Sequence, residues 1–302
     1  MNTRTAIITG ASAGLGLECA RALLANDASW HVVLAVRDTA RGAEAVERIG
    51  NRDRCTVLEM DLASLASVRT FVDAVRVAGL PPLHAIVCNA GVQVVSGTER
   101  TADGVEMTFG VNHLGHFALV QGLLDGLARP ARIVVVSSGT HDPSKFTGMP
   151  SPNYTTAADL ADPAEITDAA EGRRRYTTSK LCNVLFTYEL DRRLGHGADG
   201  IAVNAFDPGL MPGSGLARDY SAAGRWAWRY LFPALRVLPG VHSTRTSGRN
   251  LAALVSEARV EGVTGAYFAG RRQIRSSVDS YDHDKALDLW ETSERLLATV
   301  AM

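Results

Sequence analysis

Short apolar runs rich in β-branched residues alternate with amphipathic segments through the first two thirds of the chain. The apolar runs predict strands at residues 4–9, 31–36, 55–60, 84–88, 132–137 and 201–206. The amphipathic segments predict helices near residues 15–27, 40–49, 64–78, 104–127 and 177–194. Near-continuous apolar strands are typical of a sheet buried on both faces. The order of elements predicts an α/β protein with one doubly wound (Rossmann-type) parallel sheet flanked by helices.

Two segments interrupt this alternation. Residues 139–172 are polar, rich in Pro, Thr and Asp, and show no period, which indicates an insertion. Residues 209–242 carry several large aromatic side chains and predict a helical lid over a substrate. The same aromatic side chains could instead cover the core or an oligomer interface. We find no linker or repeat, so residues 1–302 are predicted to form one domain, with a last helix near 284–299.

Composition narrows the class of protein. The chain has 302 residues, 46% hydrophobic and 21% charged, so it can bury a large core. A formal net charge of −1 argues against nucleic acid or an anionic membrane as the main partner. We see neither a secretory leader nor the roughly 18 consecutive apolar residues of a membrane span. The four scattered cysteines fit a reducing compartment, and a cytoplasmic location is expected.

A glycine-rich stretch, TGASAGLG, directly follows the first predicted strand and leads into a helix. Glycines there permit a tight turn and let the backbone approach a pyrophosphate, whose charge lies against the helix N-terminus. The alternative is a glycine-rich turn without a ligand. In the position between strand and helix, the stretch predicts a dinucleotide-binding loop formed by Gly10, Ser12, Gly14, Leu15 and Gly16.

The choice of nicotinamide cofactor is usually made at the end of the second strand. An acidic residue there binds the ribose hydroxyls of NAD, whereas an Arg accommodates the 2′-phosphate of NADP. Val36 takes the position of the acid, and Arg37 follows it directly. Asp38 is interpreted as the cap of the next helix. NADP(H) is therefore predicted, although Ala13 in the loop is not the basic residue that would strengthen this prediction.

Seven segments resemble, in order, the motifs of the short-chain dehydrogenase/reductase family. They are TGASAGLG (9–16), DL (61–62), NAG (89–91), the Asn of VNHLGHF (111–117), VVVSS (134–138), YTTSK (176–180) and DPG (207–209). The resemblance implies that the nucleotide groove is lined by Asp61, Leu62, Asn89, Ala90, Gly91, Pro208, Gly209 and Met211. Asp61 can also be interpreted as a helix N-cap, and NAG as a plain turn.

Tyr176 and Lys180 lie four apart in a predicted helix and therefore share one face of it. Such a pair is often simple helix surface. The family resemblance implies instead that Tyr176 is the general acid/base and that Lys180 lowers the pKa of its hydroxyl and reaches the nicotinamide ribose. By the same resemblance, Ser138 binds the substrate oxygen and Asn112 holds a water for proton return. Ser137 is the alternative serine, on the opposite face of its strand.

Within the family, the segments 30–38, 61–73, 111–117 and 176–183 resemble protochlorophyllide oxidoreductases and their retinol-dehydrogenase-like relatives. The long gap between Ser138 and Tyr176 fits that branch, whereas VVVSSGTH and NAG look more like carbonyl reductases. We predict NADP(H)-dependent hydride transfer between nicotinamide and a carbonyl or alcohol of a bulky, largely apolar small molecule. Light-driven C=C reduction and a non-catalytic NADPH-binding sensor are the alternatives.

Several smaller features have two interpretations each. Cys182 is either a buried small residue or, as the pigment-enzyme resemblance implies, a residue near the pigment. His113 and His116 are interpreted as helix packing, since no carboxylate or Cys stands at metal-ligand spacing. The run GRRR at 172–175 is interpreted either as the solvated start of a helix or as a basic group that attracts a substrate carboxylate. Oligomeric state stays open between monomer and homodimer.

Overall fold

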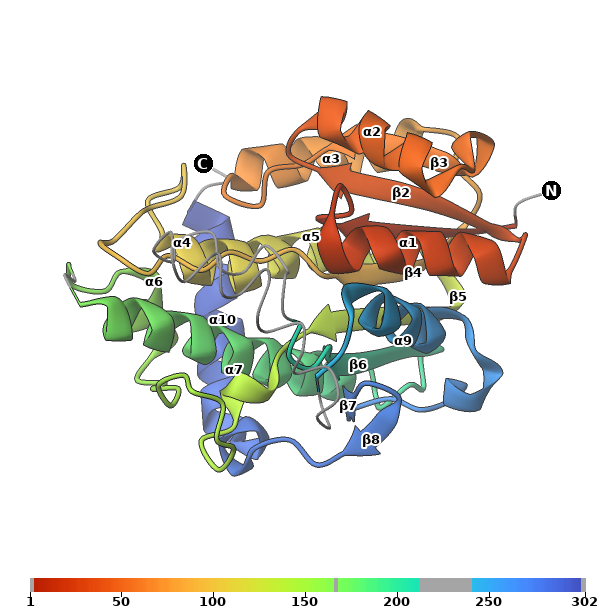
Figure 1. The fold of residues 1–302 in the computed structure, drawn as a ribbon. Coiled ribbons are helices and arrows are strands. Elements are labelled where there is room, and N and C mark those ends of the chain that lie inside the picture. The colour runs from red at the N-terminus through yellow and green to blue at the C-terminus, as the bar shows by residue number, and fades with distance from the viewer. Residues whose placement is uncertain (1–2, 166–167, 212–240, 300–302) are drawn as a thin grey trace.

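The computed structural model describes residues 3–165, 168–211 and 241–299, which form a single eight-stranded sheet with helices on both faces (Figure 1). The sheet order is β3-β2-β1-β4-β5-β6-β7-β8; all neighbours are parallel except the pair β7 and β8. The strands are β1 Arg4–Thr9, β2 Trp30–Val36, β3 Cys55–Glu59, β4 Leu83–Cys88, β5 Leu127–Val136, β6 Ile201–Asp207, β7 Ala266–Ala269 and β8 Arg272–Ile274. The predicted fold class is confirmed.

Helices cover the sheet in two layers, and the alternation of strand side chains divides the core between them. The principal helices are α1 Gly14–Asn26, α2 Thr39–Ile49, α3 Leu65–Val77, α5 Gly115–Leu123, α6 Ala157–Ala161, α7 Ala169–Arg193, α9 Thr244–Ser256 and α10 His283–Thr299. On β1, Ile7 packs in the layer of α3, α5, α7 and α10. Its neighbours Ala6 and Ile8 pack against α1, α2 and α9. Every residue of β2 is buried, as its unbroken apolar run predicts.

Side-chain caps fix where several helices begin. Asp38 accepts a hydrogen bond from the Arg41 amide at 3.1 Å and caps α2, which confirms the interpretation of this residue from the sequence. Ser64 caps α3 in the same way. Asp61 is therefore not the N-cap of α3; its Oδ1 instead accepts a hydrogen bond from the Ala63 amide at 2.9 Å, which closes a turn.

Helix α7 begins at Ala169, eight residues before the predicted start at 177. Asp168 caps it by accepting a hydrogen bond from the Ala170 amide at 2.9 Å. The first two turns are polar, so the apolar periodicity that predicts helices does not extend over them. Gly172 lets this part of the helix pack closely, since a Cβ there would lie 2.4 Å from the Val95 carbonyl oxygen.

The predicted continuous helix over 104–127 is wrong. The segment contains a short helix α4 (Met107–Phe109), a π-helical turn η2 (Gly110–Leu114) and then α5. In the π-helical turn the Gly115 amide donates to the Gly110 carbonyl. Such wider turns are common at functional sites, and this one contains Asn112. The strand predicted at 132–137 in fact begins at Leu127, and strands β7 and β8 were not predicted.

The last helix, α10, lies across α7 in the layer that also contains α5 (Figure 1). Its Trp290 ring centroid lies 5.0 Å from that of Phe117 on α5 and 6.2 Å from that of Phe186 on α7. Part of the predicted insertion 139–172 also packs here, because Ala157 and Ala161 of α6 are buried in the same core. Within the described residues, no helix combines the length and apolar character that crossing a bilayer requires.

The substrate lid predicted at 209–242 lies largely outside the described residues, which stop at 211 and resume at 241. The two described ends of this segment meet, because Leu210 and Val241 form a parallel β-bridge. The His242 amide also donates to the Leu210 carbonyl at 2.9 Å.

Candidate active site

Most of the predicted site residues follow the carboxyl ends of the strands, whereas Asn112, Tyr176 and Lys180 lie in helical segments. Parallel strands β1 to β6 bring these ends to one edge of the sheet. The chain runs outward through β2 and β3 and then returns to place β4 on the other side of β1. Crevices at such a change of direction are where open α/β sheets bind ligands.

The glycine-rich loop wraps closely around the start of α1. Gly10 and Gly14 have positive φ angles of 66° and 60°, a region that favours glycine. A Cβ on Gly16 would lie 2.7 Å from Asn89 Nδ2 and 2.8 Å from the Gly10 carbonyl oxygen, so only glycine fits. Ala13 caps α1 without a side-chain hydrogen bond. The first amide groups of α1 are therefore left for another acceptor, as a pyrophosphate site requires.

The end of β2 presents Arg37 to solvent directly after the buried Val36. Among the described residues the Arg37 guanidinium has neither a hydrogen bond nor an ion pair. A second basic residue, Arg48 of α2, donates to the Ser12 carbonyl at 2.6 Å and holds the glycine-rich loop. Arg48 was not predicted as a site residue, because its contact joins positions 36 residues apart.

Thr9 ties the NAG segment to the end of β1. Its Oγ1 accepts hydrogen bonds from the amides of Asn89 and Ala90, both at 2.8 Å. Asn89 Nδ2 donates to the Thr9 carbonyl at 2.7 Å. Thr9 was also missed as a site residue, although its place immediately before the loop was a signal. The next residue, Gly91, is exposed, and a Cβ on it would lie 3.6 Å from Lys180 Nζ.

Tyr176 and Lys180 are held together on the buried face of α7. Only 4% of Lys180 is exposed, and its Nζ lies 5.5 Å from the centroid of the Tyr176 ring. The same Nζ donates to the Val136 carbonyl at 3.3 Å, at the end of β5. Burial lowers the pKa of Lys180 to about 8. The pair is thus not helix surface, and an ammonium group lies against the tyrosine at neutral pH.

Asn112 connects this helix to the loop after β4. Its Oδ1 accepts from the Val92 amide at 2.7 Å, and its Nδ2 donates to the Val92 carbonyl and to Ser179 Oγ, both at 2.9 Å. Ser179 in turn donates to the Tyr176 carbonyl at 2.7 Å. The Asn112 side chain therefore positions α7, with Ser179 as an unpredicted intermediary. A water held by Asn112 stays a prediction.

The two serines at the end of β5 have different surroundings. Ser137 is buried and its hydroxyl donates to the Lys180 carbonyl at 2.7 Å. Ser138 is half-buried; its Oγ accepts from the Thr140 amide at 3.3 Å, and its hydrogen has no acceptor among the described residues. The surroundings favour Ser138 as the group that donates to a substrate oxygen. The Ser138 carbonyl is held at 2.7 Å by Nδ1 of the buried His141, another residue that was not predicted.

The DPG segment lies at the end of β6. Gly209 has a φ of 74°, and its amide donates to Asp207 Oδ1 at 2.9 Å. The Pro208 carbonyl accepts from Ser247 Oγ of α9 at 2.7 Å. Met211 is buried, as is Leu62 after β3. These residues lie at the same edge of the sheet as the glycine-rich loop, and their contacts with nucleotide stay predictions.

His113 and His116 are both buried, but they face different elements. His113 Nε2 lies 2.8 Å from Ser293 Oγ of α10, and its ring lies among Phe109, Phe117 and Phe186. His116 Nε2 lies 2.9 Å from Thr9 Oγ1. Burial lowers the pKa of His113 to about 3 and that of His116 to about 4. The described residues contain no group of three or more potential ligands placed to hold a metal ion.

These two histidines predict a loss of stability in mild acid. Unfolding exposes both to water, where the pKa returns to about 6.5, so the unfolded chain binds more protons than the folded one below that pH. Stability present above pH 6.5 is therefore lost as the pH falls. Between pH 8 and pH 5 each histidine should cost about 2 kcal/mol of unfolding free energy.

Urea unfolding at a series of pH values measures this effect. His113→Phe should remove about 2 kcal/mol of the decrease, because it removes one buried histidine. Burial also lowers the pKa of His141 and His31, and these two contribute to the rest of the decrease together with His116. An unfolding free energy that stays constant from pH 8 to pH 5 would show that these rings are protonated or hydrated in the folded protein.

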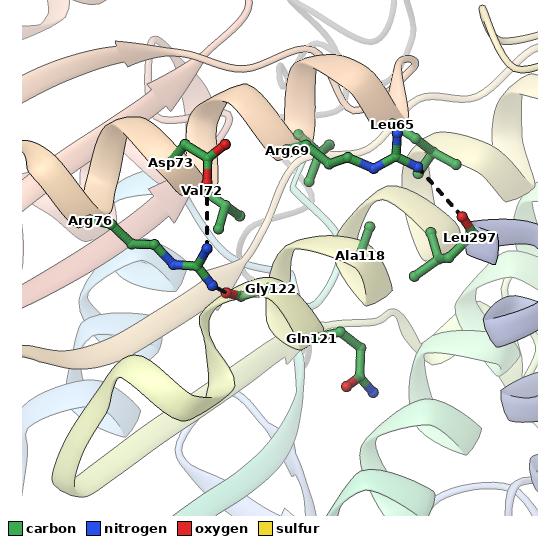
Figure 2. A pocket seen from close by; sticks show the side chains of 10 residues that line it. Leu65, Arg69, Val72, Asp73, Arg76, Ala118, Gln121, Gly122 and Leu297 are labelled. Carbon is green, nitrogen blue, oxygen red and sulfur yellow. Dashed lines mark hydrogen bonds and ion pairs between the residues drawn. The ribbon is translucent and has the colours of Figure 1, made fainter. Parts of the chain in front are cut away.

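A groove of about 430 Å³ lies away from these residues, between α3, α5 and the end of α10 (Figure 2). Arg76 donates to the Gly122 carbonyl at 2.8 Å, and Arg69 donates to the Leu297 carbonyl at 3.4 Å. These guanidinium groups hold the helices together. None of the predicted site residues lines the groove, so we do not assign it to the active site.

Sequence comparison then identifies the family. The family model for short chain dehydrogenases matches residues 4–157. The WW domain-containing oxidoreductase of Gallus gallus is 37% identical over 302 residues, covering 98% of this chain and 69% of that protein. The chain belongs to the short-chain dehydrogenase family. The protochlorophyllide reductase of Avena sativa is 36% identical over 316 residues, covering 96% of this chain and 98% of the relative.

Solved structures give the same fold. An uncharacterized protein from Mycobacterium paratuberculosis superposes with a TM-score of 0.72 at 29% identity, covering 98% of this chain and 94% of the other. A metagenomic blue fluorescent protein in complex with NADPH superposes with a TM-score of 0.63 at 23% identity, covering 89% and 98%. The chain is therefore a short-chain dehydrogenase-type oxidoreductase with a nicotinamide cofactor, as its motifs predict.

Proposed function

We propose that this protein transfers a hydride between NADP(H) and a carbonyl or alcohol of a bulky, largely apolar small molecule. The observation that carries the proposal is the buried Lys180 ammonium, anchored to the end of β5 and 5.5 Å from the Tyr176 ring centroid. Burying a charge costs free energy, and buried ionisable groups beside a partner that titrates cluster at sites of proton transfer.

The chain's own geometry supports a dinucleotide in the crevice. Gly16 lets the loop pack tightly against Gly10 and Asn89, a Cβ on Gly14 would meet no atom within 4 Å, and the first amides of α1 have no side-chain cap. NADPH, when bound, supplies the hydride. Arg37 would hold its 2′-phosphate, while Gly10, Gly14 and Gly16 would let the loop approach the pyrophosphate.

The side chains have separate tasks in the proposed reduction. Ser138 donates a hydrogen bond to the substrate carbonyl oxygen and orients it. Tyr176 gives its hydroxyl proton to that oxygen as negative charge develops there. The Lys180 ammonium stabilises the phenolate that remains, because opposite charges interact strongly in a site with little water. Asn112 keeps this helix in place through Ser179.

The size and polarity of the substrate are proposed on two grounds. The sequence WRYLFPALRVL at 228–238 is rich in large apolar residues, which suit a lid over an apolar ligand. Several relatives along nearly the whole chain are named for reduction of protochlorophyllide, which is a large molecule.

A second candidate function is light-driven C=C reduction, which the protochlorophyllide reductase relatives favour. Against it stands the position of Cys182, which is fully buried in the core that also contains residues of α5 and α10 and does not line the groove of Figure 2. Burial also raises the pKa of its thiol. We therefore rank reduction in the dark first.

The choice of cofactor is tested at Arg37. Arg37→Ala should raise the Kd for NADPH by about tenfold or more and leave the Kd for NADH within about twofold, since only NADPH carries the phosphate. Fluorescence titration measures both constants. Arg41→Ala, four residues on and also exposed, is the matched control and should change neither. Equal affinity of the unaltered protein for the two cofactors would contradict this assignment.

A further inference from the structure

Three segments of the site meet at one side chain, His116 of α5. Its Nε2 lies 2.9 Å from Thr9 Oγ1 at the end of β1. Its Nδ1 lies 3.1 Å from the carbonyl oxygen of Asn112, in the π-helical turn. Thr9 in turn holds the amides of Asn89 and Ala90. One imidazole therefore joins β1, the loop after β4 and the turn that carries Asn112.

The hydrogen bonds determine the state of the ring. The Asn112 carbonyl can only accept, so Nδ1 must carry the hydrogen. At neutral pH Nε2 is then an acceptor, because burial keeps the pKa of His116 near 4. Thr9 Oγ1 already accepts two amide hydrogens, so its own hydrogen is directed to His116. The Val87 carbonyl, a second possible acceptor for this hydrogen, is more distant at 3.4 Å.

In this arrangement the Thr9 hydroxyl makes every hydrogen bond that it can make. A hydroxyl has one hydrogen to donate and two lone pairs to accept with, and all three are in use. Loss of the His116 acceptor would release the Thr9 hydroxyl to rotate, which would loosen the amides of Asn89 and Ala90. The Asn112 carbonyl would lose its side-chain donor at the same time. Buried polar groups that are left unpaired force such rearrangements.

We infer that His116 is a positioning residue that keeps the nucleotide groove and the Asn112 turn in register, through Thr9 on one side and the Asn112 carbonyl on the other. The inference rests on the proposed NADPH function. It assigns a task to a residue that the sequence indicated only as helix packing. His113, on the same helix, has no such task because its ring faces Ser293 and the aromatic core.

Fluorescence titration of NADPH against a set of variants tests the inference. His116→Phe keeps a ring of similar size and removes both hydrogen bonds, and it should raise the Kd for NADPH about tenfold. Thr9→Val should do the same, whereas Thr9→Ser, which keeps the hydroxyl, should stay within about threefold. The double variant of His116→Phe with Thr9→Val should be at most about twofold worse than the weaker-binding single variant, because both changes break one network.

His113→Phe is the matched control: it should lower thermal stability and leave the Kd for NADPH within about twofold. If His116→Phe also changed only stability, or if the two single effects multiplied in the double variant, the inference would be overturned. Should His116→Phe not fold, the contrast between Thr9→Val and Thr9→Ser decides the matter, and equal binding by those two overturns the inference. A wild-type protein that binds neither NADPH nor NADH would instead contradict the proposed function, and this inference with it.

Discussion

Tyr176→Phe is expected to lower kcat for carbonyl reduction by about 10³-fold while NADPH still binds with nearly unchanged affinity. The substitution removes one oxygen and keeps the ring, which is 7% exposed and packs in the site. Substrate oxygen would then have no proton donor at the position of the Tyr176 hydroxyl. Turnover kinetics give kcat, and fluorescence titration gives the Kd for NADPH.

Tyr188→Phe is the control for this experiment, since it removes a hydroxyl from the same helix. Tyr188 lies three turns further along α7, where its hydroxyl is 2.7 Å from Ser276 Oγ. This variant should keep kcat within about threefold. Full activity in Tyr176→Phe would show that another group supplies the proton.

Lys180→Met is expected to separate activity from stability. The kcat/KM for reduction should fall by about 10²- to 10³-fold, because the ammonium that stabilises the phenolate is lost. The folded protein should be as stable as before or more stable, because a buried charge is replaced by an apolar chain of similar length. The Val136 carbonyl stays paired, since Asn183 Nδ2 also donates to it at 2.9 Å.

Steady-state kinetics and thermal unfolding of the same preparation test this pair of effects. Lys285→Met, in α10, is the control: its amine pairs with Asp279 and Asp282, and its loss should leave kcat/KM within about threefold. A Lys180→Met protein that kept activity within tenfold would remove Lys180 from the mechanism. A large drop in the unfolding temperature would show that the lysine is primarily structural.

Much of the sheet could be predicted because most of its strands are apolar runs that can be recognised in the sequence. The six strands β1 to β6 are short apolar runs bounded by polar turns, and β2 is buried along its whole length. The predicted helices 15–27, 40–49 and 64–78 agree with α1, α2 and α3 within about two residues. Strands β7 and β8 were missed because they have only four and three residues, too few to show a period.

Errors in the helices have local physical causes. The break at 107–115 depends on a π-helical turn, in which the Gly115 amide donates to the carbonyl five residues earlier instead of four. This change of hydrogen-bond partner leaves no mark on the apolar pattern of VNHLGHF. The early start of α7 depends on the Asp168 cap and on two polar turns that pack through Gly172. Neither signal is periodic, so neither changes a prediction that rests on hydrophobic periodicity.

In the site, the sequence indicated the residues that would act but not those that hold them. Tyr176, Lys180, Ser138 and Asn112 stand in recognisable motifs, and the structure brings α7 and the end of β5 together around Lys180. The supporting residues join distant parts of the chain: Thr9 contacts His116, 107 positions away, and Asn112 contacts Ser179, 67 positions away. A single sequence contains no local pattern that would indicate contacts between residues so far apart.

The central claim is hydride transfer from NADPH to a carbonyl in the dark, and one assay tests it most directly. Purified protein is given NADPH or NADH deuterated at C4, in darkness and in light. The panel holds bulky aromatic and polycyclic ketones, retinal-type aldehydes and protochlorophyllide. We predict oxidation of NADPH but not NADH in the dark, with deuterium in an alcohol product and no reaction by Tyr176→Phe. Product formed only under illumination, or NADPH bound without any turnover across the panel, would contradict the account.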